Sequence, residues 1–176
     1  MKTEKLMIAG IKEDIESINK AVRVLNYSLK KCTKISIKVS YTIEELDAFE
    51  NLTSRFARTS DIYTQKIMKG IILILREDAR TFLDRANLFE KLNITDAEEL
   101  KLIRDLRNEI SHEYRLSDVS EIFESVLEYS VKLLRIIEKT IVFAQDKGWF
   151  DDGDAELRQV RQTVLNLSHT PEPEDE

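Results

Sequence analysis

The amino-acid sequence predicts an all-α protein, an antiparallel up-and-down bundle of four main helices plus a short extra helix. Only four glycines and two prolines occur among 176 residues, and 34% of the residues are charged. This composition favours long helices over a loop-rich β fold. Four long stretches also repeat apolar residues at alternating spacings of three and four, which places them on one face of a helix.

The first predicted helix covers residues 3–31. Its apolar residues form a single stripe at helical spacing: Ile11, Ile15, Ile18, Val22, Leu25 and Leu29. Residues 34–41 then alternate apolar and polar side chains as a strand does, but the chain holds no second run of this kind to pair with it. We therefore expect an extended connection here.

A second helix is predicted from Thr42 to about residue 77. Thr42 and Glu45 form a T-x-x-E pattern, which is typical of a capping box at a helix N-terminus. The inward face of this helix would consist of Leu46, Phe49, Phe56, Tyr63, Ile67, Ile71 and Leu75. A shorter helix, roughly residues 79–91, is expected to follow it.

Two further long helices complete the predicted bundle. The third starts at another T-x-x-E pattern, formed by Thr95 and Glu98, and the fourth starts near Asp118 and Glu121. Gly148 is the expected end of the fourth helix. Because the connections between the long helices are short, we expect neighbouring helices to run antiparallel.

The charge of the chain is concentrated at its C-terminal end. The chain holds 33 acids and 27 bases, of which eight acids and two bases fall in residues 151–176. The preceding part, residues 1–150, therefore holds 25 of each and is neutral. We expect residues 1–150 to form the helical bundle and residues 151–176 to form an acidic, partly disordered tail with a helical piece around residues 155–167.

The sequence also predicts a cytoplasmic protein without a membrane segment. Its longest aliphatic run, Ile71–Leu75, is far shorter than the roughly 20 residues that cross a bilayer. The single cysteine, Cys32, cannot form an intramolecular disulfide. Two histidines and one cysteine cannot form a closed zinc site from one chain, so no metal site is predicted.

The stretch RNEISHEY, residues 107–114, carries the most informative pattern. An apolar stripe of the third helix contains Leu100, Ile103, Arg107, Ile110 and Tyr114. Arg107 thus stands where an apolar residue is expected, and an unpaired guanidinium is costly to bury. The position needs a carboxylate, an anionic ligand or a solvated cleft. Alternatively, the arginine stem covers apolar surface while its head reaches solvent.

His112 lies five residues after Arg107, which is about 140° around an ideal helix. The two side chains would therefore diverge in a straight helix. For both to act on one group, the helix must end or distort near Ser111, or a second copy of the chain must supply the opposing residues. The alternative is that His112 is an ordinary surface residue.

The pattern R-N-x-x-x-H-x-Y at the end of a helix in a small all-helical protein resembles the HEPN superfamily, in particular the HepT-like toxins encoded beside minimal nucleotidyltransferases. Asn108 and Tyr114 extend the short R-x4-H signature, and the layout resembles the family from about Thr42 to Gly148. The resemblance implies a metal-independent endoribonuclease that needs no cofactor. It also implies a homodimer in which the motifs of both subunits flank one cleft.

The resemblance gives each motif residue a role. His112 would be the general acid/base at the 2′-hydroxyl or the leaving oxygen, work that an imidazole suits near neutral pH. Arg107 would bind the scissile phosphate, and Asn108 would orient the phosphate or the histidine. A nucleotidyltransferase antitoxin would transfer AMP to Tyr114 and block the cleft, as in a type VII-like toxin–antitoxin system. Without the resemblance, Tyr114 simply ends the apolar stripe.

RNA binding requires positive potential, which the neutral body as a whole does not supply. Three residues give the motif helix a basic edge, Lys101, Arg104 and Arg115, and two more on the second helix would extend it, Arg55 and Arg58. Ordinary solvated surface is the alternative for each of them apart from Arg107. Two rival functions stay open at this point: a non-catalytic, substrate-binding partner subunit of a minimal nucleotidyltransferase, and a structural helical adaptor.

Overall fold

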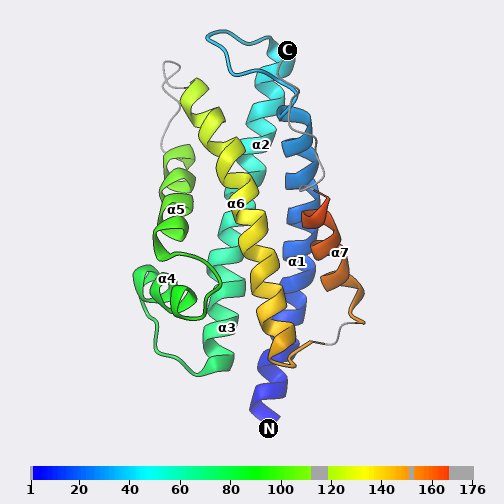
Figure 1. Ribbon diagram of the computed structural model, residues 1–176, viewed down its shortest axis with the longest axis vertical. Coiled ribbons are helices and arrows are strands. Elements are labelled where there is room, and N and C mark those ends of the chain that lie inside the picture. Colours follow the sequence, from blue (N-terminus) through cyan, green and yellow to red (C-terminus); the bar gives the residue numbers. More distant parts are fainter. Residues whose placement is uncertain (1, 112–118, 151–152, 167–176) are drawn as a thin grey trace.

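The computed structural model describes residues 2–111, 119–150 and 153–166, and this part of the chain is helical without any strand. Helix α1 (Lys2–Cys32) runs antiparallel to α2 (Ile43–Ile62), and α5 (Ala97–Ser111) runs antiparallel to α6 (Val119–Asp146) (Figure 1). These helices surround one core, because α1 contacts α2, α2 contacts α5, α5 contacts α6, and α6 contacts α1. The predicted all-α bundle is confirmed.

Helix α1 carries its predicted stripe into the core. All six stripe residues are buried: Ile11, Ile15, Ile18, Val22, Leu25 and Leu29. Residues 33–42 then cross the end of the bundle without helix or strand, as expected for the connection. The hydroxyl of Tyr41 accepts a hydrogen bond from the backbone N–H of Lys38 at 3.1 Å, which stabilises this connection locally.

Helix α2 begins at the predicted capping box. The side chain of Thr42 accepts from the N–H of Glu45, and the carboxylate of Glu45 accepts from the N–H of Thr42. The helix continues through a π-helical turn, η1 (Tyr63–Ile67), into α3 (Met68–Leu75). It ends at Arg76, whose φ of 57° lies in the left-handed region. The predicted long helix is thus confirmed, with a π turn that the apolar pattern did not indicate.

Helices α1 and α3 approach each other closely at Gly70. A Cβ atom at this position would lie 2.4 Å from Cγ1 of Ile11, far inside van der Waals contact. Only the absence of a side chain at position 70 therefore allows the two helices to pack at this distance.

The short helix α4 (Phe82–Lys91) begins at a second capping box, formed by Thr81 and Asp84. The start of α5 was misplaced by one residue, because α5 begins at Ala97 rather than directly after Thr95. The hydroxyl of Thr95 donates to the carboxylate of Glu99 at 2.8 Å. The Thr95 side chain therefore pairs with another side chain instead of capping the N-terminus of α5.

Helix α6 ends at the predicted glycine. Gly148 has a φ of 70°, and the N–H of Trp149 donates to the carbonyl of Ala144 at 3.1 Å, as in a Schellman turn. Helix α7 (Ala155–Leu165) then packs against α1 and α6. Its apolar residues are buried: Leu157, Val160 and Val164. The helical body therefore continues past the boundary expected at residue 150, while residues 167–176 lie outside the described part of the chain.

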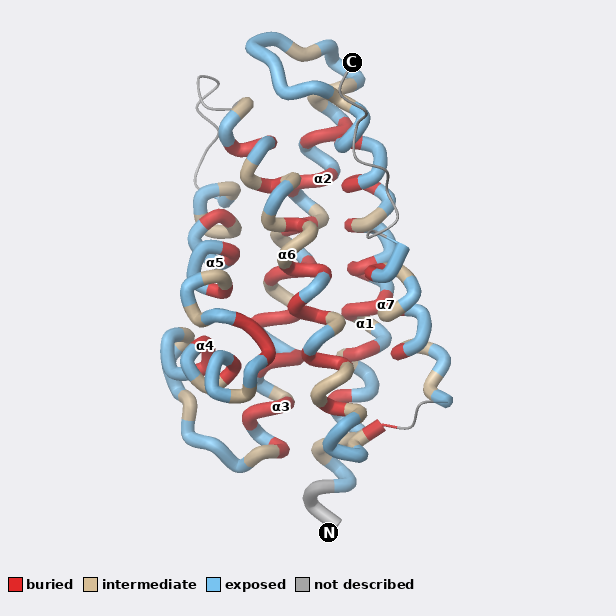
Figure 2. Tube along the Cα trace, in the orientation of Figure 1, coloured by how far each residue is buried: buried red, intermediate tan, exposed pale blue. Residues whose placement is uncertain are grey.

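Buried residues line the inward faces of the long helices, and exposed residues cover their outer faces (Figure 2). Among the described residues, none of the helices combines the length and apolarity that a bilayer-crossing segment needs. The two ends of the bundle differ, because α4 adds a short layer beside α3 and α5 (Figure 1). This added layer forms one wall of the site described next.

Candidate functional site

Arg107 lies on the face of α5 that packs against α2. Leu100, Ile103 and Leu106 on the same helix are buried in the core, whereas the side chain of Arg107 keeps 33% of its surface exposed. Of the stripe residues that the structure describes, Leu100 and Ile103 are buried and Ile110 is partly buried, and Arg107 lies at their edge. Its guanidinium reaches Asp61 across the boundary between the two helices.

The carboxylate of Asp61 on α2 is the partner that this position requires. Nε of Arg107 donates to Oδ1 of Asp61 and Nη2 donates to Oδ2, each at 2.7 Å. Such a two-pronged contact fixes the guanidinium plane and is stronger than a single ion pair. The hydrogen bonds that Arg107 donates to Asp61 raise the pKa of Arg107 above its ordinary value, so the guanidinium stays charged.

Ser111 makes a further contact with the same guanidinium. Nη1 of Arg107 donates to Oγ of Ser111 at 3.3 Å, and the Ser111 hydroxyl donates to the carbonyl of Arg107 at 3.2 Å. Ser111 belongs to the RNEISHEY stretch and lies one helical turn after Arg107. The last described turn of α5 is thus tied to the arginine that begins the motif.

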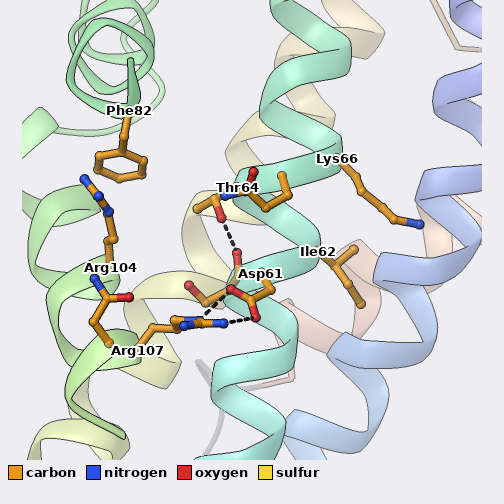
Figure 3. Close-up of a pocket in the computed structure, with 10 residues that line it drawn as sticks. Asp61, Ile62, Thr64, Lys66, Phe82, Arg104 and Arg107 are labelled. Carbon is orange, nitrogen blue, oxygen red and sulfur yellow. Dashed lines mark hydrogen bonds and ion pairs between the residues drawn. The ribbon is translucent and has the colours of Figure 1, made fainter. Parts of the chain in front are cut away.

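Arg107 also lines an open pocket of about 570 Å³ between α2, η1, α4 and α5 (Figure 3). The pocket is lined by Ser60, Asp61, Ile62, Thr64, Gln65, Lys66, Phe82, Arg104, Arg107 and Asn108. Three cations and one carboxylate are among these residues. Lys66 points away from Arg107 in Figure 3, and its Nζ lies 3.4 Å from Asp14 on α1. The positive charge that remains in the pocket comes chiefly from α5.

Phe82 on α4 and Arg104 on α5 form the wall of this pocket opposite η1 (Figure 3). The Arg104 guanidinium carbon lies 4.7 Å from the centre of the Phe82 ring, within the range of a cation–π contact. Arg85 on α4 lies near the same ring at 5.9 Å and is buried. Burial, and next the charge of Arg104, lower the pKa of Arg85. Two guanidinium groups therefore share one aromatic ring.

The predicted site residues fall into two groups within the described part of the chain. Arg107, Asn108 and Arg104 line the same pocket. Lys101 lies outside it, exposed on α5, with its Nζ 3.4 Å from Glu98. On α2, Arg55 lies 5.9 Å from the Tyr27 ring and donates to Ser28 and to the carbonyl of Val24, and Arg58 is exposed. Neither arginine of α2 lines the Arg107 pocket.

Three predicted residues, His112, Tyr114 and Arg115, lie outside the described residues. The predicted roles of His112 in catalysis and of Tyr114 in modification therefore stay predictions. The same holds for Arg115 as a binding residue. Helix α5 is described as far as Ser111, the residue directly before the histidine.

Sequence reasoning did not identify Asp61 or Phe82 as part of the site. Asp61 had a signal that could have been used, because it is the only acid between Glu50 and Glu77, a stretch that contains several bases. A lone carboxylate on a basic helix is a natural partner for an arginine that interrupts the apolar stripe of another helix. Phe82 had no comparable signal, since its packing within the short helix was not predicted.

Comparison of the chain with models of protein families, with curated proteins and with solved structures finds no match.

Proposed function

We propose that this protein is a metal-independent endoribonuclease, a HEPN-type toxin of a type VII-like toxin–antitoxin pair, which acts as a homodimer. The observation that carries the proposal is the fixed position of Arg107, the first residue of R-N-x-x-x-H-x-Y, at the wall of a pocket that also contains Arg104 and Asn108. A charged guanidinium held in a set plane beside an open pocket suits a phosphodiester ligand.

The reaction needs no group beyond those in the motif. The 2′-hydroxyl of RNA attacks the adjacent phosphorus, the bond from phosphorus to the 5′-oxygen breaks, and one proton leaves the nucleophile while another reaches the leaving oxygen. His112 would move these protons, and Arg107 would stabilise the negative charge that builds on the phosphate. Because DNA has no 2′-hydroxyl, the mechanism is specific for RNA.

A cleavage assay tests this function. Purified full-length protein is incubated with RNA in the presence of EDTA, beside the variants Arg107→Ala, His112→Ala and Arg135→Ala. We expect each motif variant to lose on the order of 10²-fold or more in rate. Arg135→Ala serves as the control, because Arg135 is an exposed arginine of α6 outside the pocket. Equal cleavage by the parent and both motif variants would refute the assignment.

Tyr114 is proposed as the site of AMP transfer by a cognate minimal nucleotidyltransferase. The added phosphate is negatively charged, so it would repel RNA that the cations of α5 otherwise attract. Intact-mass measurement after incubation with the transferase and ATP tests this step. The role of Tyr114 is excluded if no AMP is added, or if AMP is still added to Tyr114→Phe.

One observation favours a second function, the non-catalytic partner subunit of a nucleotidyltransferase. Asp61 already neutralises Arg107, and such a pair also suits a purely structural contact between α2 and α5. The two functions differ in the cell. A toxin arrests growth when it is expressed alone and is relieved by the transferase, whereas a partner subunit binds the transferase without arresting growth in its absence.

A further inference from the structure

The contact between Arg104 and Phe82 is not used by the proposed cleavage chemistry. The guanidinium carbon of Arg104 lies over the Phe82 ring, 4.7 Å from the ring centre, and the pair lies across the pocket from η1 (Figure 3). Arg104 is exposed, so its guanidinium is also open to a planar ligand. A guanidinium backed by an aromatic ring is a flat, cationic surface.

The fold holds this surface in place. Phe82 is the first residue of α4, and the capping box of Thr81 and Asp84 fixes the chain at this point. The Thr81 N–H and hydroxyl both donate to Oδ2 of Asp84, at 2.9 and 2.7 Å. Thr81 and Asp84 precede and follow Phe82 in the sequence, and their hydrogen bonds fix the start of α4. The Phe82 ring therefore has a defined place against α5.

The charge around the pair favours an anionic ligand. Within the described residues Arg104 has no ion pair, although Arg85 lies beside the same ring. The side chain of Arg85 is buried and donates from Nη1 to the carbonyl of Arg80 at 3.1 Å rather than to a carboxylate. Asp84 offsets part of the charge of Arg85, so the positive charge that a phosphate-bearing ligand would meet here comes chiefly from Arg104.

Polar groups that can read the edge of a planar ligand lie in the same pocket. Asn108 follows Arg104 by one helical turn, and Gln65 lies on the opposite wall. Each side-chain amide offers both donors and an acceptor. Thr64, by contrast, already donates its hydroxyl to the carbonyl of Ser60 at 2.9 Å and offers only an acceptor.

We infer that Arg104, backed by Phe82, is a stacking platform for one unpaired nucleobase of single-stranded RNA, next to the phosphate bound at Arg107. Arg107 follows Arg104 by three residues on α5, so both side chains face the pocket one turn apart. Bases of a duplex are hidden by pairing, whereas a single strand can present a base to a guanidinium plane. The inference rests on the proposed function for the identity of the ligand as RNA.

A binding experiment separates stacking from charge. Full-length protein carrying His112→Ala, so that the probe survives, is titrated into a fluorescent uridine oligomer and into an oligomer of equal length whose sugars lack bases. Arg104→Lys keeps the charge but removes the plane, and Phe82→Leu removes the ring behind it. Lys101→Ala, which removes an exposed charge outside the pocket, is the matched control. Thermal melting of each variant checks its fold.

We expect Arg104→Lys to weaken binding of the uridine oligomer roughly tenfold and to leave binding of the base-free oligomer unchanged. Phe82→Leu should act in the same direction, whereas Phe82→Trp should retain affinity. Lys101→Ala should affect both probes equally. The inference is overturned if Arg104→Lys weakens both probes alike or neither, or if the parent binds no RNA. Since Arg104 is exposed, its lysine variant decides the question even if Phe82→Leu unfolds.

The cleavage assay distinguishes this inference from the proposed function. Base-dependent binding without any cleavage would leave the platform standing and refute the ribonuclease. Cleavage that depends on Arg107 and His112, with equal affinity of the parent and Arg104→Lys for RNA, would refute the platform alone.

Discussion

Asp61 and Arg107 join α2 to α5 by two parallel hydrogen bonds of 2.7 Å each. Together with the contact to Ser111, these bonds use three of the five N–H groups of the guanidinium and leave two for a ligand. The same carboxylate therefore has two effects. It orients the arginine, and it offsets part of the positive charge that an anionic ligand would meet.

The strength of this pair can be measured by a double-mutant cycle. Asp61→Ala, Arg107→Ala and the double variant should give a coupling energy of about 1 kcal/mol by urea unfolding, because the pair is bidentate but partly exposed. The control is the exposed pair of Glu98 and Lys101 on one helix, for which we expect roughly 0.3 kcal/mol. Equal coupling in both cycles would show that the bidentate geometry adds no stability.

Gly70→Ala should destabilise the protein, although alanine is the better helix former. The new Cβ would lie 2.4 Å from Cγ1 of Ile11, and a β-branched side chain moves aside only with difficulty. In an Ile11→Ala background the obstructing atoms are gone, so the same change should become stabilising by roughly 0.5 kcal/mol. Gly10→Ala, which meets nothing within 4 Å, should stabilise the parent. A destabilising Gly70→Ala in both backgrounds would contradict the packing described here.

Stability should fall in alkaline solution through Cys32. Burial raises the pKa of this thiol from 9.0 to about 11, and its Sγ lies 3.3 Å from the carbonyl of Ala48. Between pH 9 and 11 the unfolded chain therefore ionises its thiol while the folded chain does not, which favours unfolding. The difference in unfolding free energy between the parent and Cys32→Ala should be constant below pH 9 and should shrink by about 2 kcal/mol up to pH 11. A difference that stays constant over this range would show that the thiol ionises alike in both states.

Helix α7 should contribute to stability as a core element does. Leu157→Ala should cost roughly 2–4 kcal/mol of unfolding free energy, because the side chain is fully buried. Arg158→Ala, at the exposed neighbouring position, should change stability by less than about 0.5 kcal/mol. Similar small effects of both changes would indicate that α7 is not part of the cooperative fold.

The helical elements could be predicted because they depend on local signals. The stripe of α1, the capping box at Thr42 and the end at Gly148 are each written in a few neighbouring residues. The start of α5 was off by one residue because Thr95 has a competing partner, Glu99, which lies beyond the T-x-x-E pattern. The helix at residues 155–165 was predicted, but its burial against α1 was not, since that depends on contacts across the whole chain. Among these contacts, the amide of Asn19 donates to Glu156 and Gln159.

The candidate site was predictable only in part. Arg107 stood out because a charge interrupts an apolar stripe, and the cost of burying it called for a carboxylate, an anionic ligand or a solvated cleft nearby. Which carboxylate meets that requirement depends on how α2 and α5 are aligned, and single-helix patterns do not contain this information. Phe82 joined the site for the same reason, through the docking of α4 beside α5.

The π-helical turn at Tyr63–Ile67 sets how α3 is rotated about the helix axis relative to α2. It contains one residue more per turn than an α-helix, as the bond from the N–H of Met68 to the carbonyl of Tyr63 shows. If the same residues formed an uninterrupted α-helix instead, α3 would be rotated by about 100° from its present orientation relative to α2. Gly70 would then no longer face Ile11, while Asp61, which precedes the turn, would keep its place opposite Arg107. The turn thus lets one continuous helix place Asp61 opposite α5 before the turn and Gly70 against α1 after it, two contacts whose helical phases differ by one residue.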